Sequence, residues 1–199
     1  MADIQGPQKL GPLTPLVGHW EGNDGVDVSY RHIDDEITET SYFESSWFKP
    51  IPAQHNGDQL LEGLNYRMTD WRHGEEAMDP FHDEVGFLLW DKANGQVMRV
   101  VVFGRGIAIL AGAEAGPHDK ELHFKAMPGE DSYGILQNKY LMERAQIKSF
   151  ESTFTFHDDG SFSYDSDLVL DITEIGVMHH TDRATLRRVK SFHPGIDNT

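Results

Sequence analysis

Short strand-like segments separated by turn residues run along nearly the whole chain, and this pattern limits the possible folds more than any other feature. Val26, Val28 and Tyr30 alternate with polar residues at a period of two, which indicates a half-buried strand. Residues 91–95 and 157–160 are predicted hairpin turns, the second because Asp-Gly supplies the positive φ angle that a tight turn requires. The predicted strands cover residues 26–31, 37–48, 60–71, 85–90, 96–103, 107–114, 121–127, 139–146, 148–156, 161–172 and 180–189.

About ten strands with short connections and hardly any helical periodicity predict an all-β fold, specifically an antiparallel up-and-down β-barrel. Closing the sheet on itself removes exposed strand edges. One short helical turn is expected at residues 10–17, irregular because Pro12 and Pro15 interrupt it. Two loops are expected, at 49–58 and 74–83, where they either cover the barrel mouth or pack against a second subunit in a homodimer.

The length of the chain is within reach of one barrel domain. We therefore expect a single domain over residues 1–199, with its core at about 10–190. Both ends, 1–8 and 191–199, are expected to be loosely held.

The charge and the cysteine content exclude several classes of partner. A formal net charge of -16 repels the phosphates of nucleic acid and the anionic face of a membrane. The chain has no Cys, which rules out disulfides and thiol nucleophiles and fits a reducing cytoplasm. Residues 1–6 show no signal-peptide pattern, and no apolar run approaches the roughly 20 residues of a membrane helix. A small molecule in a cytoplasmic protein is the expected kind of partner.

Gly18-x-Trp20 follows a short apolar turn and is typical of the closed end of a small barrel. Trp20 is expected to plug the barrel floor, while Gly18 lets the entering segment pack closely. Arg187, late in the last strand, is expected to stack over that indole. This structural role explains these residues without any ligand.

Four stretches carry a resemblance to a known family. They are Leu13–Gly22, Pro80–Phe87, Arg105–Ile107 and Ala184–Val189. In this order they resemble the nitrobindin family, haem-binding members of the calycin group that includes lipocalins and fatty-acid-binding proteins. The resemblance spans nearly the whole chain and implies a calycin-like barrel.

The resemblance also implies a haem iron held by a histidine on the last strand, four residues before the Thr of the closing motif. Thr181 stands at that position, with His180 and His179 next to it. Because successive strand residues point to opposite faces, His180 faces outward if Thr181 faces inward, and a bulge is needed to make His180 the iron ligand. Haem with peroxynitrite or nitric-oxide chemistry is therefore an alternative function.

The same alternation places Arg183 and Thr185 on the inner face with Thr181. A guanidinium inside an apolar barrel needs an anionic partner. That partner is either a ligand carboxylate, as in fatty-acid-binding proteins, or an acidic neighbour such as Asp182. The leading hypothesis is an intracellular protein that holds a small hydrophobic or amphipathic, fatty-acid-like ligand inside the barrel.

His82 and Arg105 complete the predicted ligand-binding residues. His82 and Glu84 can share one face of a strand, but His82, Asp83 and Glu84 cannot all converge on one metal ion. The favoured explanation of His82 is a hydrogen-bonded histidine at the start of a strand. A third hypothesis is an enzyme that uses the cavity, with His82 or Asp83 as acid or base, although no catalytic motif supports it.

Overall fold

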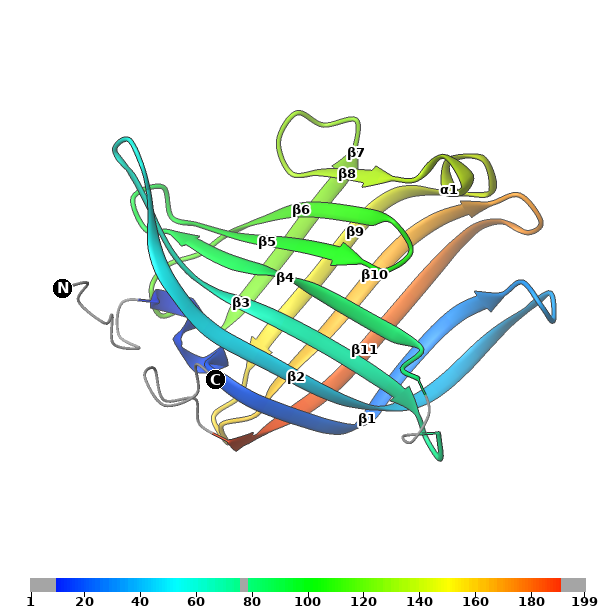
Figure 1. The fold of residues 1–199 in the computed structure, drawn as a ribbon, viewed down its shortest axis with the longest axis horizontal. Helices are drawn as coiled ribbons and strands as arrows, with labels where there is room; N and C mark the ends of the chain where they lie inside the picture. Colours follow the sequence, from blue (N-terminus) through cyan, green and yellow to red (C-terminus); the bar gives the residue numbers. More distant parts are fainter. Residues whose placement is uncertain (1–9, 76–78, 191–199) are drawn as a thin grey trace.

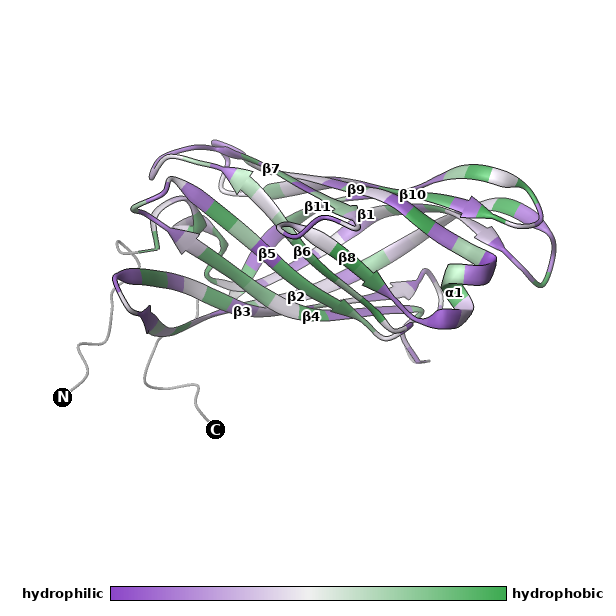
Figure 2. Cartoon of the chain, turned by 90° about the horizontal axis from the view of Figure 1, so that it is seen from above, coloured by the Kyte–Doolittle hydropathy of each residue, from purple (hydrophilic) through white to green (hydrophobic). Residues whose placement is uncertain are grey.

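The structure, a computed structural model, describes residues 10–75 and 79–190, so the predicted loose ends lie outside the described residues. In these ranges eleven strands close into a barrel, flattened when it is seen from above (Figures 1 and 2). This confirms the predicted all-β barrel of about ten strands. The elements are η2 (Gly11–Leu16), β1 (Gly18–Arg31), β2 (Glu36–Asn56), β3 (Gln59–Arg72), β4 (His82–Asp91), β5 (Gln96–Phe103), β6 (Ile107–Glu114), β7 (Glu121–Pro128), β8 (Gly134–Gln137), α1 (Lys139–Arg144), β9 (Ala145–Phe156), β10 (Phe162–Ile172) and β11 (Gly176–Lys190).

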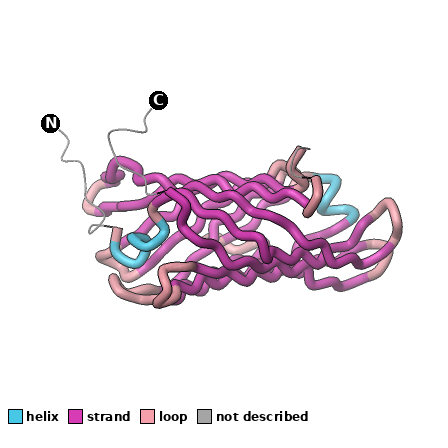
Figure 3. The backbone as a smooth tube through the Cα atoms, turned by 90° about the horizontal axis from the view of Figure 1, so that it is seen from below, coloured by secondary structure: helices cyan, strands magenta, loops and turns pink. Residues whose placement is uncertain are grey.

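Most strands pair antiparallel with their sequence neighbours, and β1 pairs with β11 to close the barrel. The exception to the meander is β8, which inserts between β6 and β7. It runs antiparallel to β6 and parallel to β7. Figure 3 shows η2 and α1, the helices of the described chain, at opposite ends of the barrel.

The predicted strand at residues 139–146 is wrong. Lys139–Arg144 instead forms α1, because Asn138 caps it: its side chain accepts a hydrogen bond from the Leu141 N–H at 3.0 Å. Arg144 in the last turn also favours a helix.

The predicted loop at residues 49–58 is also wrong, because β2 continues to Asn56 and pairs with β3 as far as Gln59. The register shifts between Ile51 and Gln54, which accommodates the prolines of this segment. In Figure 1 this hairpin projects at the same end as η2, away from the opposite mouth.

The end of the barrel that carries η2 is closed by apolar side chains. Leu13 and Leu16 are completely buried, and the Trp20 indole N–H donates to the Leu16 carbonyl at 2.6 Å. Arg188, rather than the predicted Arg187, stacks over Trp20, with its guanidinium carbon 4.7 Å from the ring centroid. Arg187 instead pairs with Asp159 at 3.0 Å.

The predicted orientation of β11 is wrong by one residue. Met178, Ala184 and Leu186 are buried in the core, whereas Thr181 and Arg183 are exposed. The even-numbered side chains therefore face the interior. Since one residue of slip would move Ala184 and Leu186 into solvent, burial of these apolar side chains fixes the register.

Candidate ligand-binding site

The half of the barrel opposite η2 contains an internal cavity of about 60 Å³. Its lining combines apolar side chains with titratable groups from both walls of the barrel. His82 and His180, whose side chains are 30% and 29% exposed, connect it to solvent. The lining residues are Met68, Asp70, His82, Glu84, Arg99, Phe103, Phe150, Tyr164, Ser166, Leu168, His180 and Asp182.

Buried and half-buried acidic side chains dominate this half of the interior. We call the set Asp27, Glu44, Asp70, Glu84 and Asp182 the acidic belt. Ionised carboxylates are rarely buried without hydrogen-bond or ionic partners. A member of the acidic belt that has no such partner therefore shows which group a ligand would have to supply.

Glu84 is the best-compensated member of the acidic belt. Arg99 donates to Glu84 at 2.6 Å, to the Ser152 hydroxyl at 3.0 Å and to the Tyr66 hydroxyl at 3.3 Å. Burial alone would raise the pKa of Glu84, but Arg99 and His82 outweigh it and lower this pKa to about 2. Glu84 and Arg99 thus form a fully buried ion pair.

Glu44 and Asp182 are joined by two tyrosines rather than by a base. Tyr164 donates to Glu44 at 2.7 Å, the Tyr42 and Tyr164 oxygens lie 2.7 Å apart, and Tyr42 donates to Asp182. With both tyrosines donating to the carboxylates, no proton lies between the two tyrosine oxygens. A proton on the Glu44 carboxyl completes the chain, because Tyr164 then accepts from Glu44 and donates to Tyr42. Burial raises the pKa of Glu44 to about 7 and that of Asp182 to about 6, which favours such a proton.

Asp70 is the least compensated member. Its side chain is almost fully buried, and its Oδ1 has no hydrogen-bond partner within the described part of the chain. Burial, together with the nearby Glu44 and Asp182, raises its pKa well above the usual value. An unpaired buried oxygen of this kind costs free energy, roughly 1–3 kcal/mol or more for a charged group.

His180 faces the cavity, and its Nε2 lies 2.5 Å from Asp27 Oδ2. The hydroxyl of Ser29 donates to the other oxygen of Asp27 at 2.6 Å. His82 faces the same cavity from β4, with Nε2 3.6 Å from Glu84. Burial would lower the pKa of His82, but Glu84 outweighs it and raises this pKa.

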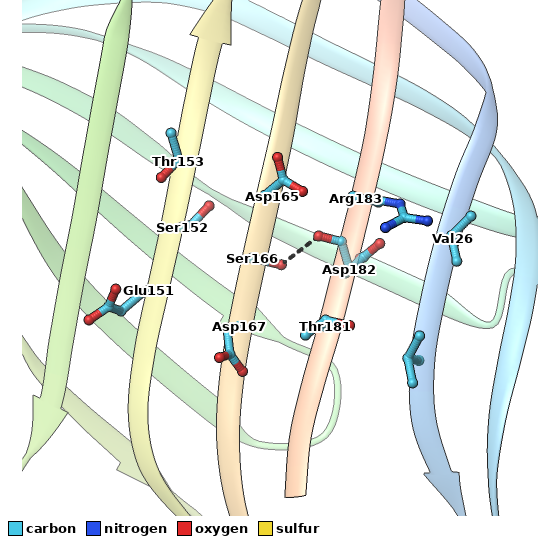
Figure 4. Close-up of a pocket in the computed structure, with 11 residues that line it drawn as sticks. Val26, Glu151, Ser152, Thr153, Asp165, Ser166, Asp167, Thr181, Asp182 and Arg183 are labelled. Carbon is cyan, nitrogen blue, oxygen red and sulfur yellow. Dashed lines mark hydrogen bonds between the residues drawn. The ribbon is translucent and has the colours of Figure 1, made fainter.

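The other predicted ligand-binding residues lie away from this cavity. Thr181 and Arg183 line a shallow polar hollow of about 370 Å³ on the outer face of β9, β10, β11 and β1 (Figure 4). Arg183 lies opposite Asp165 of β10. The half-buried Thr185 donates its backbone N–H to Asp24 at 2.9 Å, and Arg105 is exposed in the turn between β5 and β6.

Asp83, the alternative acid or base of the enzyme hypothesis, does not face the cavity with His82. It accepts two hydrogen bonds from Arg67, at 2.7 and 2.9 Å, and one from Thr69 at 3.1 Å.

Sequence reasoning missed Arg99, although a signal was present. Arg99 shares its strand face with Val97 and Val101, which are completely buried, so the alternation of β5 alone places a charge in the core. Glu44 likewise shares a face with Tyr42 and Phe48. Asp70 likewise follows Tyr66 and Met68 on the buried face of β3.

The fold and this interior site define a calycin-like barrel with a polar internal cavity. The chain belongs to the THAP4-like, heme-binding beta-barrel domain family, whose model matches residues 9–188, and this confirms the nitrobindin-like resemblance. The crystal structure of Rv2717c from M. tuberculosis is similar, with a TM-score of 0.63 and 19% sequence identity over 94% of this chain and 99% of that chain. At this identity the likeness shows the fold alone. No curated protein matches the sequence.

The residues around His180 do not fit a haem as they are arranged. One feature suits an iron ligand, since a carboxylate partner commonly orients a ligating imidazole. However, Nε2 of His180 is the nitrogen held by Asp27, and the cavity of about 60 Å³ is far below the roughly 300–1,000 Å³ of typical cofactor sites. Asp70, Glu84 and Asp182 also line the space that an apolar macrocycle would need.

Within the described residues, no helix is long and apolar enough to cross a membrane.

Proposed function

We propose that this protein binds one small amphipathic molecule in the open half of its barrel. The observation that carries the proposal is the cavity itself, where buried polar groups such as Asp70 and Glu84 lie beside Phe103, Phe150 and Leu168. Concave sites with apolar walls and a few convergent polar groups are the usual form of a small-molecule site.

An acidic ligand such as a fatty acid is disfavoured by the same residues. Arg183 lies on the outer face, and Arg99 is already paired with Glu84. A ligand carboxylate in the cavity would therefore meet the acidic belt without a free guanidinium.

Hexan-1-ol is a suitable first probe, because it is small, neutral and amphipathic. We expect saturable chemical-shift changes in ¹H–¹⁵N spectra at residues that line the cavity. Ser166→Phe, which fills the cavity, should abolish them, whereas Asp165→Phe, on the outer face of the same strand, should not. Equal binding by both variants, or no binding by the wild type, would overturn the proposal.

Haem is the second candidate, because the family is a haem-binding one and His180 faces the cavity. It requires the walls of the open half to move apart. Ferric haem should then give a one-to-one Soret change that is lost in His180→Ala and retained in His179→Ala, whose side chain is exposed. Identical titrations of the two variants would exclude His180 as the ligand.

The cytoplasmic location, the homodimer and an enzymatic use of His82 remain predictions from the sequence.

A further inference from the structure

The charge inventory of the cavity is unbalanced. The acidic belt contains five carboxylates, of which Glu84 pairs with Arg99 and His82, and Asp27 pairs with His180. Within residues 10–75 and 79–190, no Lys, Arg or His nitrogen lies within 4.0 Å of the carboxylates of Glu44, Asp70 or Asp182.

Glu44 and Asp182 are linked by hydrogen bonds through Tyr164 and Tyr42, which supply part of the donors that the two carboxyl groups need. The chain Glu44–Tyr164–Tyr42–Asp182 is complete when one of its two carboxyl groups holds a proton, so it carries one negative charge. The other carboxylate has no basic nitrogen of the described residues within 4.0 Å.

Asp70 has no such arrangement. Its Oδ1 is buried, unpaired and part of a side chain that lines the cavity next to Asp182 and Tyr164. A hydrogen-bond donor with a positive charge would satisfy this oxygen and offset the negative charge of the chain that joins Glu44 and Asp182.

A metal ion does not meet this need. Among the described residues, no three His, Asp or Glu side chains converge on a position that could hold one. An ammonium group is compact, carries three donors on one nitrogen and tolerates carboxylates at separate places. Phe103, Phe150 and Leu168 supply apolar surface for the rest of such a molecule.

We propose that the cavity selects a small protonated amine, whose ammonium group donates to Asp70 and whose apolar part lies against Phe103, Phe150 and Leu168. This inference rests on the proposed function, because it names the class of ligand for the same cavity. It also accounts for the poor fit of a haem, since the polar lining is suited to a cation.

The test compares three probes of equal chain length: hexylammonium, hexan-1-ol and hexanoate. Isothermal titration near pH 8 keeps the amine protonated, because an alkylamine titrates near pH 10, about where a lysine does. We expect hexylammonium to bind at least about tenfold more tightly than hexan-1-ol, and hexanoate to bind more weakly than either. Equal affinities for the amine and the alcohol would overturn the inference.

Asp70→Asn provides the matched variant, with Asp165→Asn on the outer face as its control. Asp70→Asn should remove the preference for the amine over hexan-1-ol, while Asp165→Asn should behave as the wild type. An amine preference that survives in Asp70→Asn would overturn the assignment to Asp70. If Asp70→Asn fails to fold, the three-probe series on the wild type still decides the charge preference.

The two proposals fail differently. If hexan-1-ol binds and the amine has no advantage, only the cationic ligand class is lost. If none of the three probes binds, the proposed function itself is lost.

Discussion

Arg99 and Glu84 show what a buried ion pair demands of its surroundings. Both side chains are nearly inaccessible, and the guanidinium also lies 5.0 Å from the centroid of the Phe154 ring. Such a pair contributes little net stability, but removing one partner leaves an uncompensated charge in the core.

We therefore expect Arg99→Met to lower the free energy of unfolding by roughly 3–5 kcal/mol, measured by urea denaturation. The double variant Arg99→Met/Glu84→Gln should recover most of this loss, because its interior holds no unpaired charge. A double variant no more stable than Arg99→Met would contradict this account of the pair.

The stability of the protein should depend on pH through Glu44 and Asp182. Burial raises both pKa values, to about 7 and about 6, so each carboxyl stabilises the fold while it is protonated. This contribution is full below the unfolded-state pKa, near 4, and is lost as the pH rises to about 7. Glu44 alone should remove roughly 2–3 kcal/mol between about pH 5 and about pH 8.

Urea denaturation at several pH values measures how the free energy of unfolding falls with rising pH. Glu44→Gln should reduce this fall, and Asp165→Asn, an exposed control on the outer face, should leave it unchanged. A wild-type protein that gains stability over this range would show that Glu44 is ionised throughout.

At the scale of the elements, the strands were predictable where alternation and turn chemistry agree. The hairpins at Asn94-Gly95 and Asp159-Gly160 meet this condition, and both glycines have positive φ angles. Segment 139–146 was missed, because its strand-like pattern was judged without the cap at Asn138. The inner face of β11 was missed because the resemblance placed an inward residue at Thr181, against the apolar alternation of Met178, Ala184 and Leu186.

The cap of α1 is testable by itself. Asn138→Ala should cost about 1 kcal/mol, because the Leu141 N–H loses its acceptor. Asn138 also donates to the Arg105 carbonyl at 2.6 Å, and Asn138→Asp separates the two roles by keeping the cap and losing this donor. In thermal or urea denaturation, the wild type should be the most stable, Asn138→Asp less stable and Asn138→Ala the least stable. If Asn138→Asp were as unstable as Asn138→Ala, the lost free energy would come from the hydrogen bond to the Arg105 carbonyl and not from the cap.

At the scale of the molecule, the two ends of the barrel differ in composition. The end at η2 is filled by apolar side chains such as Leu13, Leu16 and Trp20, whereas the open half contains the acidic belt. The fold was predictable because an alternating pattern repeats in every strand. The grouping of the site was not, because Asp70 and Glu84 lie on the neighbouring strands β3 and β4, whereas Asp182 lies on β11, and only closure of the barrel brings β11 to them.

This asymmetry should appear in hydrogen exchange followed by mass spectrometry. Amides of the closed half, around Trp20 and Leu88, should exchange slowest, since opening them disrupts the apolar core. Amides near the turns after β1 and β10, and in α1, should exchange fastest. Equal protection at both ends would contradict a core concentrated at η2.

The seal that η2 and Trp20 form at one end has a kinetic consequence. With one end plugged, a molecule in the cavity shares a single passage with any molecule that would replace it. Exchange is then strictly dissociative: the occupant leaves before its successor enters. Adding more of a competitor can prevent rebinding, but it cannot hasten departure, so the residence time does not depend on the concentration of the competitor.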